Sequence, residues 1–176
     1  MREETICAGF GGQGILLLGK LIALCAMKEN KFNTYMPSYG AEVRGGTAYS
    51  MTIISDEEIP SPIILIPDTV IAMNAPSFRK FKDKVKKGGL LIVNSSLVKE
   101  IPKTVKIKAI KFPFTDIAIS LGNVKVANTV ALGAYIKKTK VISVKAALAA
   151  LEEFMKDKKL LVLNKLALLK GASLVK

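Results

Sequence analysis

Three closely spaced glycines, Gly9, Gly11 and Gly14, form the stretch whose residue types and spacing best suit binding chemistry. They follow a short apolar run at 6–8 and precede an apolar segment that begins at Ile15, an order that predicts a strand, a tight turn and a helix. Glycine permits positive φ values and lets a ligand approach bare backbone. The helix N-terminus would direct free N–H groups and the positive end of its dipole at that ligand. The stretch therefore predicts an anion site, usually for phosphate.

The same glycines satisfy the G-x-G-x-x-G spacing of dinucleotide-binding folds, which leaves a second interpretation open. Such a site also needs an acidic residue about 20 positions further on, at the end of the second strand, to hold a ribose hydroxyl. The predicted second strand, at 32–36, ends without one, because Glu29 precedes it and Glu42 lies in the next loop. A third interpretation is that the glycines only allow close packing of strand and helix.

A second polar, glycine-rich stretch at 37–46 contains Arg44, one of only three arginines in the chain. Gly45 and Gly46 would keep the surroundings of its side chain uncrowded. The planar guanidinium, with five donors, suits a phosphate or a carboxylate ligand, or an ion pair with Glu42 inside the loop. Both interpretations stay open at this point.

Small polar residues follow two predicted buried strands, at 69–73 and 90–93. Open α/β sheets place ligands beyond the carboxyl ends of their strands. Asn74, Asn94 and Ser95 are therefore candidates for the same rim as the glycine turn. The alternative is that each only shapes its own turn.

The periodicity of apolar residues predicts the elements that must position these loops. Predicted strands cover 6–8, 32–36, 47–55, 69–73, 90–93 and 105–110. The last is an edge strand or a strand with one exposed face, because lysines alternate along it. Predicted helices cover 13–29, 78–86 (closed by Gly88-Gly89 as a C-cap), 113–121, 124–138, 144–156 and 160–175. We predict an α/β protein with a single domain over 1–176: a three-layer α/β/α Rossmann-like sandwich around a mostly parallel, mixed central sheet.

The net charge of +13 is unevenly spread along the 176 residues, since residues 79–176 carry 22 of the 27 basic side chains. A nucleic-acid partner is one interpretation. However, 24 of the basic residues are lysine, whereas base recognition and phosphate binding favour arginine. A solvated lysine-rich surface or the docking of an acidic partner are the alternatives, and we expect no nucleic acid.

The two cysteines, Cys7 and Cys25, and the absence of histidine limit the chemistry of the chain. They exclude a CxxC iron–sulfur site, a Cys/His zinc site and a histidine-based catalytic triad. Both thiols fall in predicted buried elements, where inert packing is expected. No apolar run reaches the roughly 20 residues of a membrane span, and the N-terminus does not have the order of a signal peptide, so we expect a cytoplasmic protein.

Four segments in this order and spacing resemble the gamma subunit, or gamma-type domain, of 2-oxoacid:ferredoxin oxidoreductases. They are GFGGQG at 9–14, PSYGAEVRGG at 37–46, NTVALGAYI at 128–136 and NKLALLKGA at 164–172. Members of that family decarboxylate a 2-oxoacid such as pyruvate, a branched 2-oxoacid or 2-oxoglutarate on thiamine diphosphate. They pass the electrons through iron–sulfur clusters to ferredoxin and release an acyl-CoA.

The resemblance implies a non-autonomous subunit that docks over the active site and helps to bind coenzyme A (CoA). It implies that thiamine diphosphate and the clusters belong to alpha-, beta- and possibly delta-type partner subunits, so that no catalytic residue and no metal site is expected in this chain. The residues that it assigns to the two loops are Gly11, Gly12, Gln13 and Gly14, and Tyr39, Glu42, Arg44, Gly45 and Gly46. A free-standing nucleotide-binding Rossmann-like module is the alternative from a different class.

Overall fold

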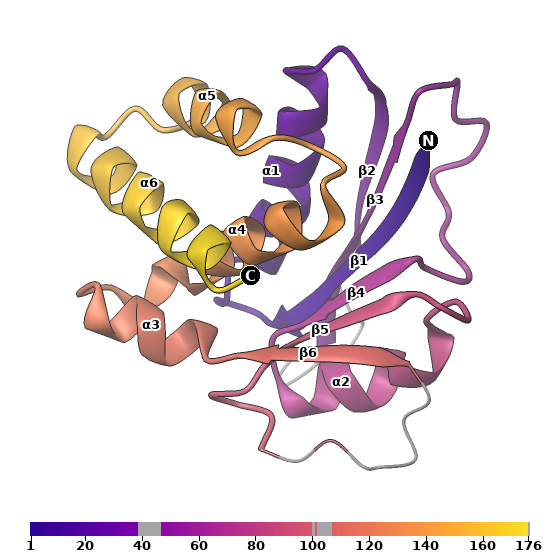
Figure 1. Cartoon of the computed structure of the whole chain (residues 1–176), viewed down its shortest axis with the longest axis horizontal. Helices are drawn as coiled ribbons and strands as arrows, with labels where there is room; N and C mark the ends of the chain where they lie inside the picture. The colour runs from indigo at the N-terminus through magenta and orange to yellow at the C-terminus, as the bar shows by residue number, and fades with distance from the viewer. Residues whose placement is uncertain (39–46, 100, 102–106, 176) are drawn as a thin grey trace.

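A mixed sheet of six strands lies between helices, as Figure 1 shows. The computed structural model describes residues 1–38, 47–99, 101 and 107–175. The strands are β1 (Arg2–Phe10), β2 (Phe32–Ser38), β3 (Thr47–Ser55), β4 (Thr69–Ala72), β5 (Leu90–Asn94) and β6 (Lys108–Phe112), in the order β2-β3-β1-β4-β5-β6. β1, β4, β5 and β6 are parallel, whereas β3 runs antiparallel to both β1 and β2. The predicted mostly parallel, mixed sheet is therefore confirmed.

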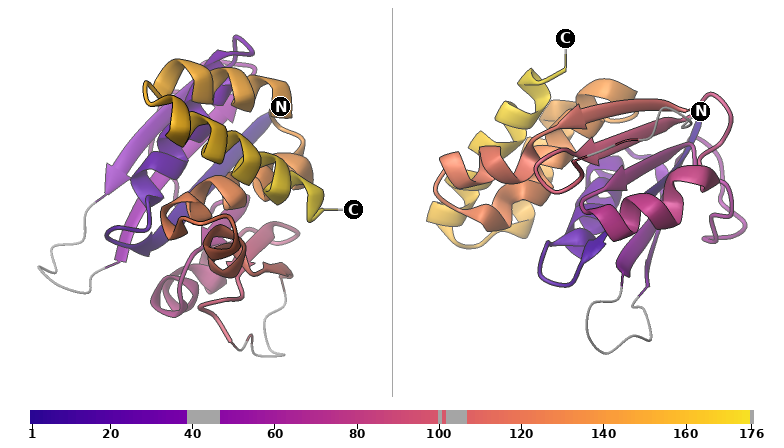
Figure 2. Two further views of the ribbon diagram at one scale, coloured as in Figure 1. Left: turned by 90° about the vertical axis from the view of Figure 1, so that its left-hand side faces the viewer. Right: turned by 90° about the horizontal axis from the view of Figure 1, so that it is seen from below.

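Helices cover the two faces of the sheet unequally (Figures 1 and 2). They are α1 (Ile15–Met27), α2 (Ala75–Phe81), α3 (Phe114–Ser120), α4 (Ala127–Thr139), α5 (Val144–Phe154) and α6 (Lys158–Ser173), with short 3-10 turns at Lys82–Lys84 and Val124–Val126. α2 lies on one face, over a smaller apolar core. The other described helices gather on the opposite face around the larger core, where α1 and α4 are the most deeply buried.

The backbone of α1 lies close to β3 because a glycine of the helix and small polar side chains of the strand form the contact between the two elements. A β-carbon on Gly19 would lie 2.3 Å from the Ser50 hydroxyl oxygen, a distance that only glycine allows. The hydroxyls of Ser50 and Thr52 donate to helix carbonyl oxygens, those of Ile15 (3.3 Å) and Gly19 (3.2 Å) respectively. Buried hydroxyls are thereby paired, and α1 is held at a fixed depth over the sheet.

The helix α6 packs on α4 through a glycine contact. A β-carbon on Gly171 would lie 1.9 Å from the Val130 carbonyl oxygen, and one on Gly133 would lie 2.0 Å from the Leu168 carbonyl oxygen. The hydroxyl of Thr129 donates to the side-chain oxygen of Asn164 at 2.6 Å within this contact. Gly171 therefore allows the two helices to pack closely.

Several element boundaries differ from the sequence predictions, among them those of α2 and β6. α2 begins at Ala75, not 78, because the Asn74 side chain accepts a hydrogen bond from the Ser77 amide and caps the helix. The helix gives way to the 3-10 turn at Lys82, so the predicted C-cap at Gly88-Gly89 is wrong: Gly88, with φ +81°, instead turns the chain toward β5. β6 begins at Lys108 rather than 105 and is an edge strand as predicted.

None of the helices in the described part of the chain combines the length and apolar character that crossing a bilayer requires.

Candidate functional site

The glycine stretch joins the end of β1 to the start of α1, as the sequence predicts. β1 ends at Phe10 and α1 begins at Ile15, with Gly14 at the N-cap position. Gly12 and Gly14 adopt left-handed backbone conformations, with φ of 89° and 68°. These values favour glycine over residues with a β-carbon, so the turn depends on its composition.

The N-terminus of α1 has no side chain of its own to neutralise it. Gly14 offers no capping oxygen, and the first turn contains no acidic residue. The first amides of a helix have no partner within the helix, and its dipole is positive at this end. Gly11 and Gly12 are exposed beside it. The loop therefore presents backbone donors and positive potential, and neither residues 11–14 nor the first turn of α1 contains a carboxylate that would compete with an anion.

Internal packing requires Gly9 and Gly14 to be glycine but does not require Gly11. A β-carbon on Gly9 would lie 2.6 Å from the Gln13 side-chain oxygen and from an Ile15 methyl group. One on Gly14 would lie 2.4 Å from the side-chain nitrogen of Asn128. Around Gly11 a β-carbon would meet no heavy atom of the described residues within 4 Å, and Gly11 is not among the positive-φ glycines.

Gln13 shapes the loop from the inside. Its side-chain oxygen accepts hydrogen bonds from the Phe10 amide (2.7 Å) and from the side-chain amide of Asn74 (3.0 Å). Its side-chain nitrogen lies 3.5 Å from the Met73 carbonyl oxygen, which it faces as a donor. The predicted binding residue Gln13 is thus engaged within the protein, and it joins the glycine loop to the end of β4.

The ends of β4 and β5 lie together beside the glycine loop, as predicted, and the buried side chain of Asn94 joins them. The Asn94 side chain donates to the Met73 carbonyl oxygen (3.1 Å) and to the Thr115 hydroxyl (2.8 Å), and its oxygen accepts from the Thr115 amide (3.3 Å). Ser95 is half-buried, and its amide donates to the Phe112 carbonyl oxygen at 2.9 Å. Asn94 therefore fixes the end of β5 against β4 and the start of α3.

Asn128 in α4 holds the glycine loop from the helix side of the sheet. Its side-chain nitrogen donates to the Gly14 carbonyl oxygen at 3.1 Å, and its oxygen accepts from the Thr129 amide at 2.8 Å. Asn128 thus holds the neighbouring backbone of Gly14. Sequence reasoning missed Thr115 and Asn164; the only signal for either was a polar residue within an otherwise apolar helical pattern.

The second predicted loop is flanked by β2 and β3, which meet the end of the sheet where β1 enters the glycine loop. Its residues Tyr39, Glu42, Arg44, Gly45 and Gly46 lie outside the described residues. On the strands beside it, Thr47 at the start of β3 pairs with Phe10 at the end of β1, and Ser38 at the end of β2 pairs with Tyr49. The two ends of the stretch therefore leave the sheet beside the glycine loop.

A dinucleotide site of Rossmann type finds no support in the described strand ends. In that fold the ribose carboxylate ends a parallel strand that follows the glycine turn. Here β2 is an antiparallel edge strand separated from β1 by β3. The parallel neighbour of β1 is β4, which ends at Ala72, and the two residues that follow it, Met73 and Asn74, are not acidic.

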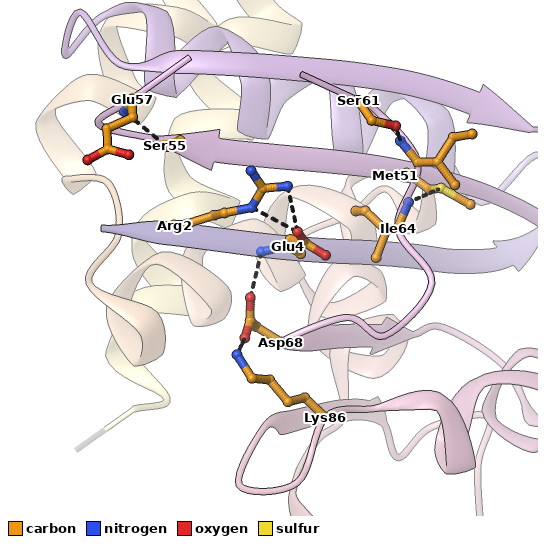
Figure 3. A network of polar contacts seen from close by, with 10 residues as sticks. Arg2, Glu4, Met51, Ser55, Glu57, Ser61, Ile64, Asp68 and Lys86 are labelled. Atoms are coloured by element: carbon orange, nitrogen blue, oxygen red, sulfur yellow. Dashed lines mark hydrogen bonds and ion pairs between the residues drawn. The ribbon is translucent and has the colours of Figure 1, made fainter. Parts of the chain in front are cut away.

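Titratable groups near the opposite edge of the sheet serve the structure. Figure 3 shows Asp68 accepting a hydrogen bond from the Glu4 amide (3.0 Å) and forming an ion pair with Lys86 (2.9 Å). Burial raises the pKa of the nearby Glu3 carboxyl, although a hydrogen bond with Thr69 opposes that shift.

The two cysteines are buried and lie apart from any metal-binding arrangement. Burial raises the pKa of both Cys7 and Cys25 to about 12, which confirms the expectation of inert thiols. Over the residues with described positions, there is no group of three His, Cys, Asp or Glu side chains that could hold a metal ion.

Known proteins resemble this chain in both sequence and fold. The family described as pyruvate ferredoxin/flavodoxin oxidoreductase matches residues 4–174. The 2-oxoglutarate synthase subunit KorC of Methanocaldococcus jannaschii is 37% identical over 173 residues, which are 94% of this chain and 92% of that protein.

Two solved structures superpose closely on the chain. The gamma subunit of a keto/oxoacid ferredoxin oxidoreductase from Geobacter sulfurreducens gives a TM-score of 0.86 at 32% identity, covering 97% of this chain and 96% of that one. The 2-oxoglutarate:ferredoxin oxidoreductase of Magnetococcus marinus, solved with 2-oxoglutarate, CoA and succinyl-CoA bound, gives 0.89 at 25% identity, covering 98% of this chain and 31% of that one. The chain belongs to the pyruvate ferredoxin/flavodoxin oxidoreductase family and is a gamma-type subunit of a 2-oxoacid:ferredoxin oxidoreductase.

Proposed function

We propose that the chain docks over the active site of its complex and that the Gly9–Gly14 loop forms one wall of the site for the phosphates of CoA. The complex would decarboxylate a 2-oxoacid oxidatively, pass the electrons to ferredoxin and release an acyl-CoA. Catalytic residues, thiamine diphosphate and iron–sulfur clusters would reside in alpha-, beta- and possibly delta-type partner subunits, and the complex would work in the cytoplasm.

The observation that carries this proposal is Gly11, a glycine that packing among the described residues does not require. It is exposed, has open space where a β-carbon would stand, and lies beside the uncapped N-terminus of α1. A glycine at such a position suits the close approach of an atom from outside the chain. An anion fits the site best, because helix amides and the helix dipole meet it there.

CoA matches this chemistry, since it is an anionic molecule whose pyrophosphate suits a turn of backbone amides. The related enzyme from Magnetococcus marinus was solved with CoA and succinyl-CoA bound. Gly12 and Gly14 would supply the shape of the turn, whereas Gln13, Asn94 and Ser95 would act by holding the turn and the adjacent strand ends. Tyr39, Glu42, Arg44, Gly45 and Gly46 would form the facing wall, with Arg44 as the candidate phosphate partner.

Amide hydrogen exchange of the assembled complex, with and without CoA, tests the proposal. We expect CoA to slow the exchange of amides in the peptide that covers Gly11 to Leu17, because bound phosphate would occupy those donors. The edge strand β6 serves as the internal control, since it lies at the far side of the sheet from β2 and β3. Unchanged exchange at the loop under saturating CoA would refute the contact, although the chain would still be a subunit of the complex.

A titration of the isolated chain separates the proposal from the free-standing nucleotide module. We expect no tight binding of NAD(H) or NADP(H), because the described strand ends lack the ribose carboxylate. Tight NAD binding by the isolated chain would favour the module instead.

A further inference from the structure

The outer face of α6 carries an apolar stripe that the protein leaves uncovered. Val162, Leu166 and Leu169 are 66%, 51% and 48% exposed. At 3.6 residues per turn they lie opposite the face that α6 buries against α4, which is formed by Asn164, Ala167, Leu168 and Gly171. Isolated exposed aliphatic residues are ordinary, but three of them aligned on one helix face are typical of an interaction surface.

The spacing of the stripe is that of a helix–helix seam. Val162, Leu166 and Leu169 are separated by four and then three residues, the alternation with which helices pack along each other. Because the stripe extends over two helical turns, a single loop residue of a partner would not cover it. A helix laid along α6 would cover all three side chains at once.

Lysines border the stripe on both sides. At 3.6 residues per turn, one border of the stripe contains Lys158 and Lys165. The other border contains Lys159 and Lys170. Lys165 forms an ion pair with Glu152 of α5, whereas Lys158, Lys159 and Lys170 are exposed. Residues that flank a helix seam select the partner by charge. The borders of this seam therefore favour acidic side chains on the partner helix.

The same charges oppose the pairing of α6 with a second copy of itself. Either a parallel or an antiparallel pair of α6 helices would bring lysine borders against lysine borders, and like charges in such positions are destabilising. The net charge of +13 adds long-range repulsion between copies.

The helix is held rigidly, which suits a docking surface. Its buried face contacts α4 at backbone distance through Gly133 and Gly171, and the Thr129–Asn164 hydrogen bond fixes its position along α4. In Figure 1, α6 lies on the outside of the molecule, beyond α4 and away from the sheet. A partner would therefore lose little free energy in ordering α6.

We propose that the Val162–Leu166–Leu169 stripe is the docking surface for a helix of another subunit of the complex, with an apolar seam bordered by Asp and Glu. The inference rests on the chain's place in a multi-subunit oxidoreductase, but not on its contact with CoA. It also gives part of the basic second half of the chain a role, because the borders of the stripe supply four of those lysines.

Substitutions on the stripe test the proposal in the co-expressed complex. Leu166→Glu and Leu169→Glu place a charge in the seam, and we expect each to raise the dissociation constant of the chain from the remaining subunits by about tenfold or more. Leu65→Glu is the matched control, because Leu65 is 79% exposed in the segment between β3 and β4 and should leave the constant unchanged. Lys170→Glu should weaken binding more at low salt than at high salt, while Lys170→Gln should have a smaller effect.

Three results would overturn the proposal. One is an unchanged dissociation constant for both leucine variants, and another is an equal loss for Leu65→Glu, which would assign the effect to surface charge in general. The third is a wild-type chain that sediments as a dimer and becomes a monomer with Leu166→Glu. Circular dichroism melting of each isolated variant verifies that it folds. Normal CoA protection at the glycine loop alongside any of these results would leave the proposed CoA contact intact.

Discussion

The side-chain amide of Asn128 donates to the carbonyl oxygen of Gly14 at 3.1 Å and occupies the space where a β-carbon on Gly14 would stand. This contact joins the N-cap of α1 to the beginning of α4. Through the neighbouring Thr129, which bonds Asn164, α4 is joined in turn to α6. The candidate ligand loop and the candidate docking helix are therefore held by the same central helix.

Gly14→Ala should destabilise the isolated chain, whereas Gly11→Ala should not. The new methyl group at position 14 meets the Asn128 amide at 2.4 Å on a backbone with φ 68°. A left-handed conformation costs a non-glycine residue about 1–3 kcal/mol, before any displacement of Asn128. Gly11→Ala meets no neighbour among the described residues, so we expect its unfolding free energy to lie within about 0.5 kcal/mol of wild type.

Urea unfolding of both variants gives the comparison. Equal stabilities of Gly14→Ala and wild type would mean that the loop is not held as described. A large loss for Gly11→Ala would show an internal role for this glycine and would remove the observation on which the proposed site rests.

Gly171→Ala should loosen α6 from α4. A β-carbon there would lie 1.9 Å from the Val130 carbonyl oxygen, so the two helices must separate to admit it. Overpacking of this kind costs about 1–3 kcal/mol. Thermal melting should show the loss, and Lys170→Ala, an exposed neighbour on the same helix, should leave the melting temperature nearly unchanged. A Gly171→Ala protein as stable as wild type would contradict the backbone contact.

Glu3→Gln should make the folded chain more stable at neutral pH. Burial raises the pKa of Glu3 in the folded state above its ordinary value of 4.5, so the folded protein binds a proton more readily than the unfolded chain does. The unfolding free energy therefore falls as pH rises between the unfolded and the folded pKa, and the loss persists at pH 7. Glutamine removes the charge and keeps a side chain that can bond Thr69.

Stability measured from pH 4 to pH 8 tests this sign. We expect the gain from Glu3→Gln to be small at pH 4 and larger at pH 7. A stability gain from Glu3→Gln that becomes smaller toward pH 7 would contradict a raised pKa of Glu3 in the folded chain.

Much of the fold was predictable because its apolar pattern is local. The strand at 47–55 has the predicted bounds, and the helices on the larger core differ from prediction by only a few residues at their ends. The start of α2 was also within reach, since Asn at 74 followed by Pro at 76 is an N-terminal helix signal. The strand order β2-β3-β1 could not be predicted, because the periodicity of apolar residues does not determine which strands pair.

The candidate site was predictable in its location but not in the role of each side chain. The spacing of Gly9, Gly11 and Gly14 identified the turn, but it could not show which glycine the interior requires. Gln13 was a possible ligand contact through the family resemblance, and Asn94 was one because it follows a predicted buried strand. Their donors and acceptors are used within the protein, which depends on the neighbouring backbone of Met73 and on Thr115 rather than on local sequence.

The most direct measurement of the central claim is the KM for CoA of the reconstituted complex that carries Gly11→Asp. The new carboxylate would stand where a CoA phosphate is proposed to approach, without disturbing the chain, so we predict a rise in that KM of about tenfold or more, equivalent to about 1.4 kcal/mol or more. The KM for the 2-oxoacid should change little, because we propose that its site lies with the partner subunits. A CoA KM equal to that of the wild-type complex, in a variant that folds and assembles normally, would contradict the claim that this loop borders the CoA site.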